Sequence, residues 1–143
     1  MRKNLIIVGS IVLACTFLLS ACGAAGKLEE YDFAPDKVAS INAVIGESRK
    51  VSGVSTGIEN SKQYKQYTYA TPSMASDLSV YLQYLMDEGW IVLTDIDLSG
   101  GRGVAELGIE SADSGKILIM TIDFQTDRYS IRIEKDKGAL IRY

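Results

Sequence analysis

Histidine is absent from this 143-residue chain, and cysteine occurs only as Cys15 and Cys22. Without histidine, the chain lacks the commonest general base at neutral pH and the commonest side-chain ligand of metals. Cys15 lies in an N-terminal segment that we expect to be removed, so the mature chain keeps a single cysteine. One cysteine excludes an intrachain disulfide and a cysteine-ligated zinc site. We therefore predict no metal and no cofactor.

Positive charge is also scarce, because 15 lysine and arginine residues face 18 aspartate and glutamate residues, which gives a formal net charge of −3. Removal of Arg2 and Lys3 with the N-terminal segment, which has no acidic residue, changes this charge to −5. Clustered lysine and arginine supply most of the affinity for phosphate backbones and anionic headgroups. We therefore expect no nucleic-acid partner.

The first 21 residues have the layout of an export signal. Arg2 and Lys3 precede an apolar run from Leu5 to Leu19, and small residues follow that run. A helix needs roughly 20 apolar residues to cross a bilayer, and this run is shorter. Its length and its flanking residues favour a cleaved signal peptide over an uncleaved membrane anchor.

The tetrapeptide Leu19-Ser20-Ala21-Cys22 resembles the lipobox of bacterial lipoproteins. This resemblance implies cleavage before Cys22 and attachment of a diacylglyceryl group to its sulfur. The tetrapeptide at residues 12–15, which ends in Cys15, has a similar pattern but leaves a shorter apolar run before it. We therefore expect a signal peptide over residues 1–21 and lipid attachment at Cys22. Two acyl chains would hold the protein on the extracytoplasmic face of the cell membrane.

Residues 22–35 begin with small side chains and show no sustained apolar period, so we predict a lipidated N-terminus and tether there. Residues 36–143 contain no internal repeat and are long enough for one hydrophobic core, which predicts a single domain. The segment from Asp36 to Ile45 has apolar residues at both helical and strand spacing. Pro35 before it and Gly46 after it favour a short helix.

Two segments, Arg49 to Ile58 and Gln63 to Ala70, are rich in β-branched residues and tyrosine. They flank the polar stretch at residues 59–62, and this combination predicts a β-hairpin. Gly53 and Gly57 interrupt the first of these segments. Because glycine inside a strand often marks an irregularity, we expect a bulge or bend in this strand.

The clearest helical pattern lies between Thr71 and Gly89. Thr71 or Ser73 can cap the start of this helix, and Gly89 provides its end. Apolar side chains recur at helical spacing and should form one buried stripe, consisting of Leu78, Tyr81, Leu82, Leu85 and Met86.

Four strands should follow this helix, over Trp90 to Asp97, Val104 to Glu110, Lys116 to Phe124 and Tyr129 to Lys135. Their short connections, rich in glycine, serine and aspartate, favour an antiparallel meander. The nearly continuous apolar run at residues 117–122 is typical of a strand that is covered on both faces near the middle of a sheet. We predict an α+β fold, in which a hairpin, a helix and a four-stranded meander form an antiparallel β-sheet with one main helix packed on one face.

The helix-to-strand junction YLQYLMDEGW and the strand GKILIMTID resemble the corresponding parts of small, uncharacterised lipoproteins of Gram-positive bacteria. This similarity covers most of the mature domain. It implies an exported, lipid-anchored protein, and it brings no assigned activity with it.

Residues 53–57 match G-x-S-x-G, the nucleophile elbow of α/β-hydrolases. That elbow requires a turn from a strand into a helix and a histidine partner for the serine. The chain has no histidine, and these residues fall in the first strand of the predicted hairpin. We interpret them as a strand bent by its glycines.

A second pattern has the ligand spacing of an EF-hand-like calcium loop, with oxygen-bearing side chains at Asp95, Asp97, Ser99 and Glu106. Arg102 would bring a positive charge close to the ion, and the predicted flanking elements are strands, whereas the motif requires helices. We therefore interpret this stretch as the end of a strand followed by a hairpin turn.

Five tyrosines could form an aromatic surface for a ligand, namely Tyr64, Tyr67, Tyr69, Tyr81 and Tyr84. Such residues more often pack across strands and against a helix, and we expect that arrangement here, with Tyr67 and Tyr69 on one face of their strand. Asp95 and Asp97 also share a predicted strand face. Nothing near them marks one as the acid of a glycosidase-like pair.

Together, these features predict a non-enzymatic binding or accessory protein of the cell envelope, attached to the lipid bilayer through acylated Cys22. Its partner would be an envelope protein or a small ligand. Two alternatives remain open. One is a calcium-binding adhesion or signalling module that uses the loop from Asp95 to Glu106, and the other is a carboxylate-based hydrolase that uses the same acidic residues.

Overall fold

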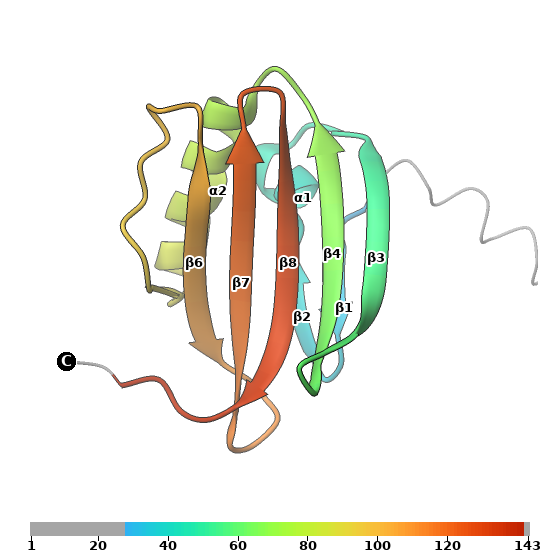
Figure 1. Ribbon diagram of the computed structural model, residues 1–143, viewed down its shortest axis with the longest axis vertical. Helices are drawn as coiled ribbons and strands as arrows, with labels where there is room; N and C mark the ends of the chain where they lie inside the picture. Colours follow the sequence, from blue (N-terminus) through green and yellow to red (C-terminus); the bar gives the residue numbers. More distant parts are fainter. Residues whose placement is uncertain (1–27, 142–143) are drawn as a thin grey trace, which may run out of the picture.

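The computed structural model describes residues 28–141, so the predicted signal peptide and Cys22 lie outside the described residues. Within these residues the fold is α+β, with eight strands in two antiparallel sheets and two helices. In Figure 1 the larger sheet faces the viewer, and both helices lie behind it. The predicted fold class, including one main helix on one face of the sheet, is confirmed.

The larger sheet has six strands in the order β3-β4-β8-β7-β6-β5. Their bounds are β3 (Val51–Glu59), β4 (Lys62–Ala70), β5 (Ile91–Val92), β6 (Arg102–Glu110), β7 (Lys116–Gln125) and β8 (Arg128–Lys137). The last four strands form the predicted meander, and β7 lies near the middle of the sheet as expected. The final strand, β8, also pairs with β4, which joins the meander to the predicted hairpin.

The hairpin of β3 and β4 turns at Asn60 and Ser61, whose φ angles are 50° and 64°. Positive φ at both central residues is the requirement of a type I′ turn, whose twist matches that of the flanking strands. The register of β3 against β4 shifts between Val51 and Gly53. The irregularity predicted from the glycines of this strand is therefore present at its first glycine.

Helix α2 (Met74–Asp87) crosses behind the sheet and connects β4 to β5. Four of the five predicted stripe residues are buried, but the Met86 side chain is 43% exposed. Met86 lies at the margin of the buried stripe, where the helix surface turns toward solvent. Gly89, with a φ of 95°, follows the helix as predicted. The N-cap residue is Ser73, although its side chain makes no capping hydrogen bond.

The predicted tether over residues 22–35 includes a strand of the folded domain. Strand β1 (Glu30–Phe33) pairs with β2 (Asp36–Ala39) in a separate two-stranded sheet. Tyr31 and Phe33 are 1% and 4% exposed, so they belong to the core. A four-residue strand holds only two inward positions, which is too short a pattern to stand out from its polar neighbours.

The predicted helix from Asp36 to Ile45 is helical only in its second half, because its first half is strand β2. Helix α1 (Ile41–Ile45) begins after Ser40, whose side chain accepts a hydrogen bond from the backbone N–H of Ala43. Gly46 ends the helix with a φ of 72°. Pro35 therefore lies in the β1–β2 connection and does not start the helix. The local pattern could not reveal this, because pairing with β1 decides the conformation of residues 36–39.

The predicted strand from Trp90 to Asp97 is much shorter than expected, and only β5 is regular. Beyond β5, the backbone N–H of Leu93 still donates to the carbonyl of Glu106 at 2.8 Å. The N–H of Glu106 then donates to the Thr94 side chain, at 3.0 Å. Because a side chain replaces the next backbone acceptor, the ladder ends. The following segment folds back so that Ile96 and Leu98 pack against the core.

Strand β7 is covered on one face only, whereas its apolar run predicted cover on both. Leu118, Met120 and Ile122 on the inner face are 1% exposed or less, but Ile117 and Ile119 on the outer face are only partly buried. The outer face has only partial cover, which comes from single side chains. A Cβ atom built on Gly108 would lie 3.0 Å from Leu140 and 3.4 Å from Ile119, so these side chains meet over that glycine.

The hydrophobic core lies between the inner face of the six-stranded sheet and the layer formed by both helices and the β1–β2 hairpin. Among residues 28–141, no helix is both long and apolar enough to cross a membrane. Close packing in this core restricts Gly103 of β6. A Cβ atom at this position would lie 2.8 Å from the ring of the buried Phe124.

We predict that Gly103→Ala lowers the free energy of unfolding by about 1 to 3 kcal/mol, because the methyl group forces Phe124 out of its packed position. The matched control is Gly53→Ala in β3, where a Cβ atom would meet Thr68 at an ordinary 3.8 Å. Its effect should stay within about 0.5 kcal/mol. Urea unfolding followed by circular dichroism measures both variants, and equal effects would contradict the packing assignment.

Candidate functional site

The residues of the predicted calcium loop do not come together in the structure. Asp95, Asp97 and Ser99 are exposed on the segment between β5 and β6, and Glu106 lies within β6. One oxygen of the Asp97 carboxylate accepts hydrogen bonds from the backbone and side chain of Ser99, at 2.9 and 2.6 Å. Among the described residues, no three acidic, histidine or cysteine side chains are grouped so that they could hold a metal ion.

The same acidic residues do not form a glycosidase-like pair. The hydrogen bonds from Ser99 lower the pKa of Asp97, whereas the acid of such a pair needs a raised pKa. Asp95 lines a hollow of about 390 Å³ between α2 and the segment after β5. Its other lining side chains are mostly apolar or uncharged, namely Ser79, Leu82, Gln83, Met86, Val92, Thr94, Ile96 and Leu98. Asp97 and Glu106 lie outside this hollow.

The G-x-S-x-G pattern lies entirely within strand β3, as interpreted from the sequence. Ser55 Oγ is 3.3 Å from the hydroxyl of Tyr64, and it is exposed at the outer face of the sheet. Gly57 leaves room for the Tyr64 ring, because a Cβ atom there would lie 3.2 Å from it. This glycine therefore serves cross-strand packing.

The predicted tyrosines pack as expected and do not form an open aromatic surface. Tyr67, Tyr69 and Tyr81 are buried, whereas Tyr64 and Tyr84 are partly exposed. Tyr67 and Tyr69 lie on the inner face of β4, where Tyr67 stacks on Tyr31 with ring centroids 4.6 Å apart. These rings hold the β1–β2 hairpin against the sheet.

The buried tyrosine hydroxyl groups find polar partners inside the core. The hydroxyls of Tyr31 and Tyr69 are 2.7 Å apart, and that of Tyr81 donates to the carbonyl of Ala39 at 3.0 Å. Burial raises the pKa of Tyr69 to about 12, although its hydrogen bond with Tyr31 acts in the opposite direction. Burial also raises the pKa of Tyr31 and Tyr81 well above the ordinary value. The fold therefore keeps these phenols neutral.

Asp77, in the first turn of α2, is the buried charge of this core and is 4% exposed. Its carboxylate accepts two hydrogen bonds from the Arg49 guanidinium, at 2.8 and 3.0 Å, and one from the Tyr129 hydroxyl at 3.1 Å. These bonds raise the pKa of Arg49, and burial together with Asp77 raises that of Tyr129. Arg49 and Tyr129 both hydrogen-bond to Asp77 inside the fold, so we interpret this cluster as structural.

We predict that alkaline pH destabilises the protein through Tyr69. An unfolded tyrosine ionises near pH 10, whereas Tyr69 in the folded protein has its pKa raised to about 12. Its contribution is therefore fully present below pH 10 and is lost as the pH rises to about 12, by an amount of about 2 to 3 kcal/mol.

Urea unfolding at pH 8, 10 and 11.5, together with phenolate absorbance, measures this loss. Tyr69→Phe should show a smaller fall in stability over the same range than the wild-type chain. An identical pH dependence in the two proteins would contradict the assignment to Tyr69.

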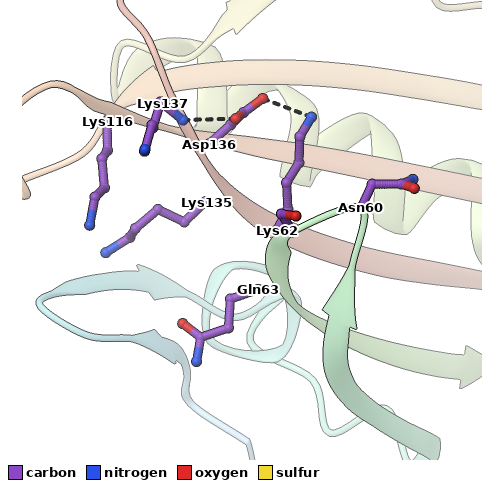
Figure 2. Close-up of a pocket in the computed structure, with 8 residues that line it drawn as sticks. Asn60, Lys62, Gln63, Lys116, Lys135, Asp136 and Lys137 are labelled. Carbon is purple, nitrogen blue, oxygen red and sulfur yellow. Dashed lines mark hydrogen bonds and ion pairs between the residues drawn. The ribbon is translucent and has the colours of Figure 1, made fainter.

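A polar pocket lies at the end of the sheet that carries the β3–β4 turn, and four of its eight lining residues are lysines. Its volume is about 390 Å³, which lies within the range of roughly 300 to 1,000 Å³ common for ligand pockets. It is lined by Asn60, Ser61, Lys62, Gln63, Lys116, Lys135, Asp136 and Lys137. In Figure 2, Lys116 and Lys135 extend to the same side, whereas Lys62 extends away from them toward Asp136. We call this feature the lysine pocket.

Three different regions of the sheet build the lysine pocket. The start of β4 supplies Lys62, the start of β7 supplies Lys116, and the end of β8 supplies Lys135 and Lys137. The register places Lys116 opposite Lys137 and Gln63 opposite Lys135. These side chains are thus brought together by strand pairing, at the lower end of the sheet in Figure 1.

Lys135 forms the back of the lysine pocket and is only 9% exposed. Its ammonium nitrogen lies 2.9 Å from Asp36 and donates to the carbonyl of Ala34 at 3.0 Å. Burial tends to raise the pKa of Asp36, but hydrogen bonds from Ser111 and Ala112 and the pair with Lys135 outweigh it, so the pKa is lowered. This ion pair locks the β1–β2 hairpin against the pocket wall.

The other lysines are more exposed and only partly neutralised. Lys62 pairs with Asp136 at 2.7 Å, and Lys116 pairs with Asp113 at 2.7 Å. The bond with Asp136 raises the pKa of Lys62, so this amine stays protonated and cannot act as a nucleophile near neutral pH. Lys137 is exposed and has no ion-pair partner among the described residues. The pocket therefore presents ammonium donors to solvent.

Sequence reasoning missed the lysine pocket, because the net negative charge argued against any anion-binding surface. The one local signal is the alternation of Lys135 and Lys137 in the stretch EKDKG. Alternation places two side chains on the same face of a strand, but it cannot show that Lys62 and Lys116 lie beside them. No protein-family model matches the chain, and no curated protein matches it either.

Proposed function

We propose that this chain is a lipid-anchored extracytoplasmic protein of the cell envelope that binds an anionic ligand in the lysine pocket without catalysing a reaction. The observation that carries the binding function is the presence of four lysines in the lining of one hollow of an acidic chain. The anchoring rests on the resemblance of Leu19-Ser20-Ala21-Cys22 to a lipobox.

The charges around the lysine pocket favour an anion over a cation or a neutral ligand. The four lysines outnumber the three carboxylates with which they pair, those of Asp36, Asp113 and Asp136. Each ammonium group has three N–H donors, and the ion pairs of Lys62 and Lys116 leave donors free for a ligand. Phosphate and carboxylate groups match such a site because they accept several charge-assisted hydrogen bonds at once.

The place where the chain enters the domain also leaves the lysine pocket accessible. Leu28, the first described residue, accepts a hydrogen bond from Ser40 at the start of α1. In Figure 1, α1 lies in the upper half of the view, whereas the β3–β4 turn and the end of β8 lie at the bottom. The described chain therefore begins in the half of the domain that lies away from the lysine pocket.

The lysine pocket should bind tripolyphosphate, used as a probe, at low ionic strength, and added salt should weaken this binding. The double variant Lys116→Gln/Lys137→Gln should lose at least tenfold in affinity, because it removes two partly exposed ammonium groups from the lining. Isothermal titration calorimetry on the full chain in a nonionic detergent measures the dissociation constants.

The matched control is Lys37→Gln/Lys50→Gln, which removes the same charge from positions outside the pocket. Its affinity should change less than twofold. If the wild-type chain fails to bind at millimolar probe, or if both double variants lose affinity equally, the lysine pocket is not the binding site.

Cys22→Ala should prevent lipid attachment and move the protein from the membrane fraction to the soluble fraction of the exported material. Cys15→Ala is the matched control, because it removes the other cysteine and leaves the lipobox intact. It should remain lipidated. Mass spectrometry of the mature N-terminus provides the measurement, and an unmodified Cys22 or a retained Met1 in the wild-type protein would end the anchoring proposal.

A further inference from the structure

Strand β3 forms one edge of the six-stranded sheet and pairs only with β4 among the described strands. It is nine residues long, whereas β5 at the opposite edge has two. Figure 1 shows β3 running along nearly the full height of the sheet. An edge of this length offers a row of unpaired backbone groups to another chain.

The turn geometry shows which backbone groups of β3 point outward. A two-residue type I′ turn closes on a hydrogen-bonded pair, which here is Glu59 and Lys62. In an antiparallel ladder such pairs alternate with pairs that make no mutual bonds. The N–H and C=O groups of Val54, Thr56 and Ile58 therefore point away from β4, toward the open side.

Within the part of the chain that the structure describes, the usual protections of an edge strand are missing over most of β3. Residues 51–58 include no charged residue and no proline, and the bulge lies at one end of the strand. Val54 and Ile58 are 61% and 76% exposed, which is high for apolar side chains. Proteins usually blunt a free edge with lysine, proline or a covering loop. The exposed surface of β3 is therefore suited to a partner strand.

The sequence of β3 is complementary to itself in one antiparallel register. In this register Thr56 of one chain lies opposite Thr56 of a second chain. Val54 of each chain then lies opposite Ile58 of the other, and the outward backbone groups of the two strands face each other. In the same register Glu59 lies opposite Gly53, so no like charges meet. A register centred on Ser55 places Ile58 opposite the bulge, which breaks the ladder.

We propose that β3 pairs with β3 of a second copy of this chain, so that two sheets join into one continuous antiparallel sheet about a twofold axis at Thr56. A twofold axis makes the contact isologous, which closes the assembly at a dimer. The pairing satisfies the outward backbone groups and covers the exposed apolar pair of each strand. It uses neither the lysine pocket nor the lipid anchor, so it stands independently of the proposed function.

Cysteine cross-linking tests this register directly, because residues 28–141 contain no cysteine. Full-length Thr56→Cys in membranes should form a disulfide-linked dimer on mild oxidation. Ser55→Cys is the matched control, because the register places Ser55 opposite Gly57, and it should cross-link at least tenfold less. The wild-type chain, treated identically, measures any background from Cys22.

A mixed experiment distinguishes this register from any other. Val54→Cys and Ile58→Cys should each cross-link poorly alone but should link to each other when a tagged copy of one is expressed with the other. Self-linking of Cys at either position, or equal linking at all positions, would overturn the register. Linking of the Thr56→Cys variant to a different protein would show that the edge serves another partner.

Thr56→Lys tests the dimer without any cross-link, because it places two ammonium groups opposite each other at the axis. Sedimentation in nonionic detergent should show a dimer for the wild-type chain and at least a tenfold larger dissociation constant for the variant. Ala75→Lys, on an exposed position of α2, is the control and should remain dimeric. Thermal unfolding checks that both variants are folded. A monomeric wild-type chain or a dimeric Thr56→Lys variant refutes the proposal.

Discussion

The buried carboxylate of Asp77 is the constraint on which the layering of this protein depends. A charge in the core is very costly unless it is paired and fully hydrogen-bonded. The partners of Asp77 come from the segment before β3, through Arg49, and from β8, through Tyr129. These hydrogen bonds tie helix α2 both to the segment that precedes β3 and to β8. This pairing couples the hairpin, the helix and the meander into one cooperative unit.

The two faces of the six-stranded sheet differ in character. The inner face provides nearly all of the apolar burial, whereas much of the outer face is polar and exposed to solvent. There, Arg132 lies 4.0 Å from the ring centre of Tyr64 and pairs with both Glu59 and Glu134. Such contacts satisfy the outer face without help from another layer. Surfaces that remain available for binding are consequently found at an end and an edge of the sheet.

Elements with a long, regular pattern could be predicted from the sequence, and short or irregular ones could not. The stripe on α2 and the apolar patterns of β6 to β8 extend over many residues, so neighbouring segments do not obscure them. Strand β1 has only two buried positions, Tyr31 and Phe33, and could be recognised only beside its partner β2. The prediction of a strand beyond β5 was wrong for a related reason. The apolar pattern continues there, but the Thr94 side chain accepts the hydrogen bond that would have extended the ladder.

The sequence by itself determined the fold class, the hairpin, the main helix and the absence of histidine chemistry, because each follows from residue types or from patterns within one segment. It also carries the pattern on which the lipid anchor is proposed. Only the tertiary structure decided the lysine pocket and the open edge. Lys62, Lys116 and Lys137 belong to three segments that meet only because β8 pairs with β4 on one side and with β7 on the other. The same strand order leaves β3 at the margin, and no local pattern encodes which strand will lie there.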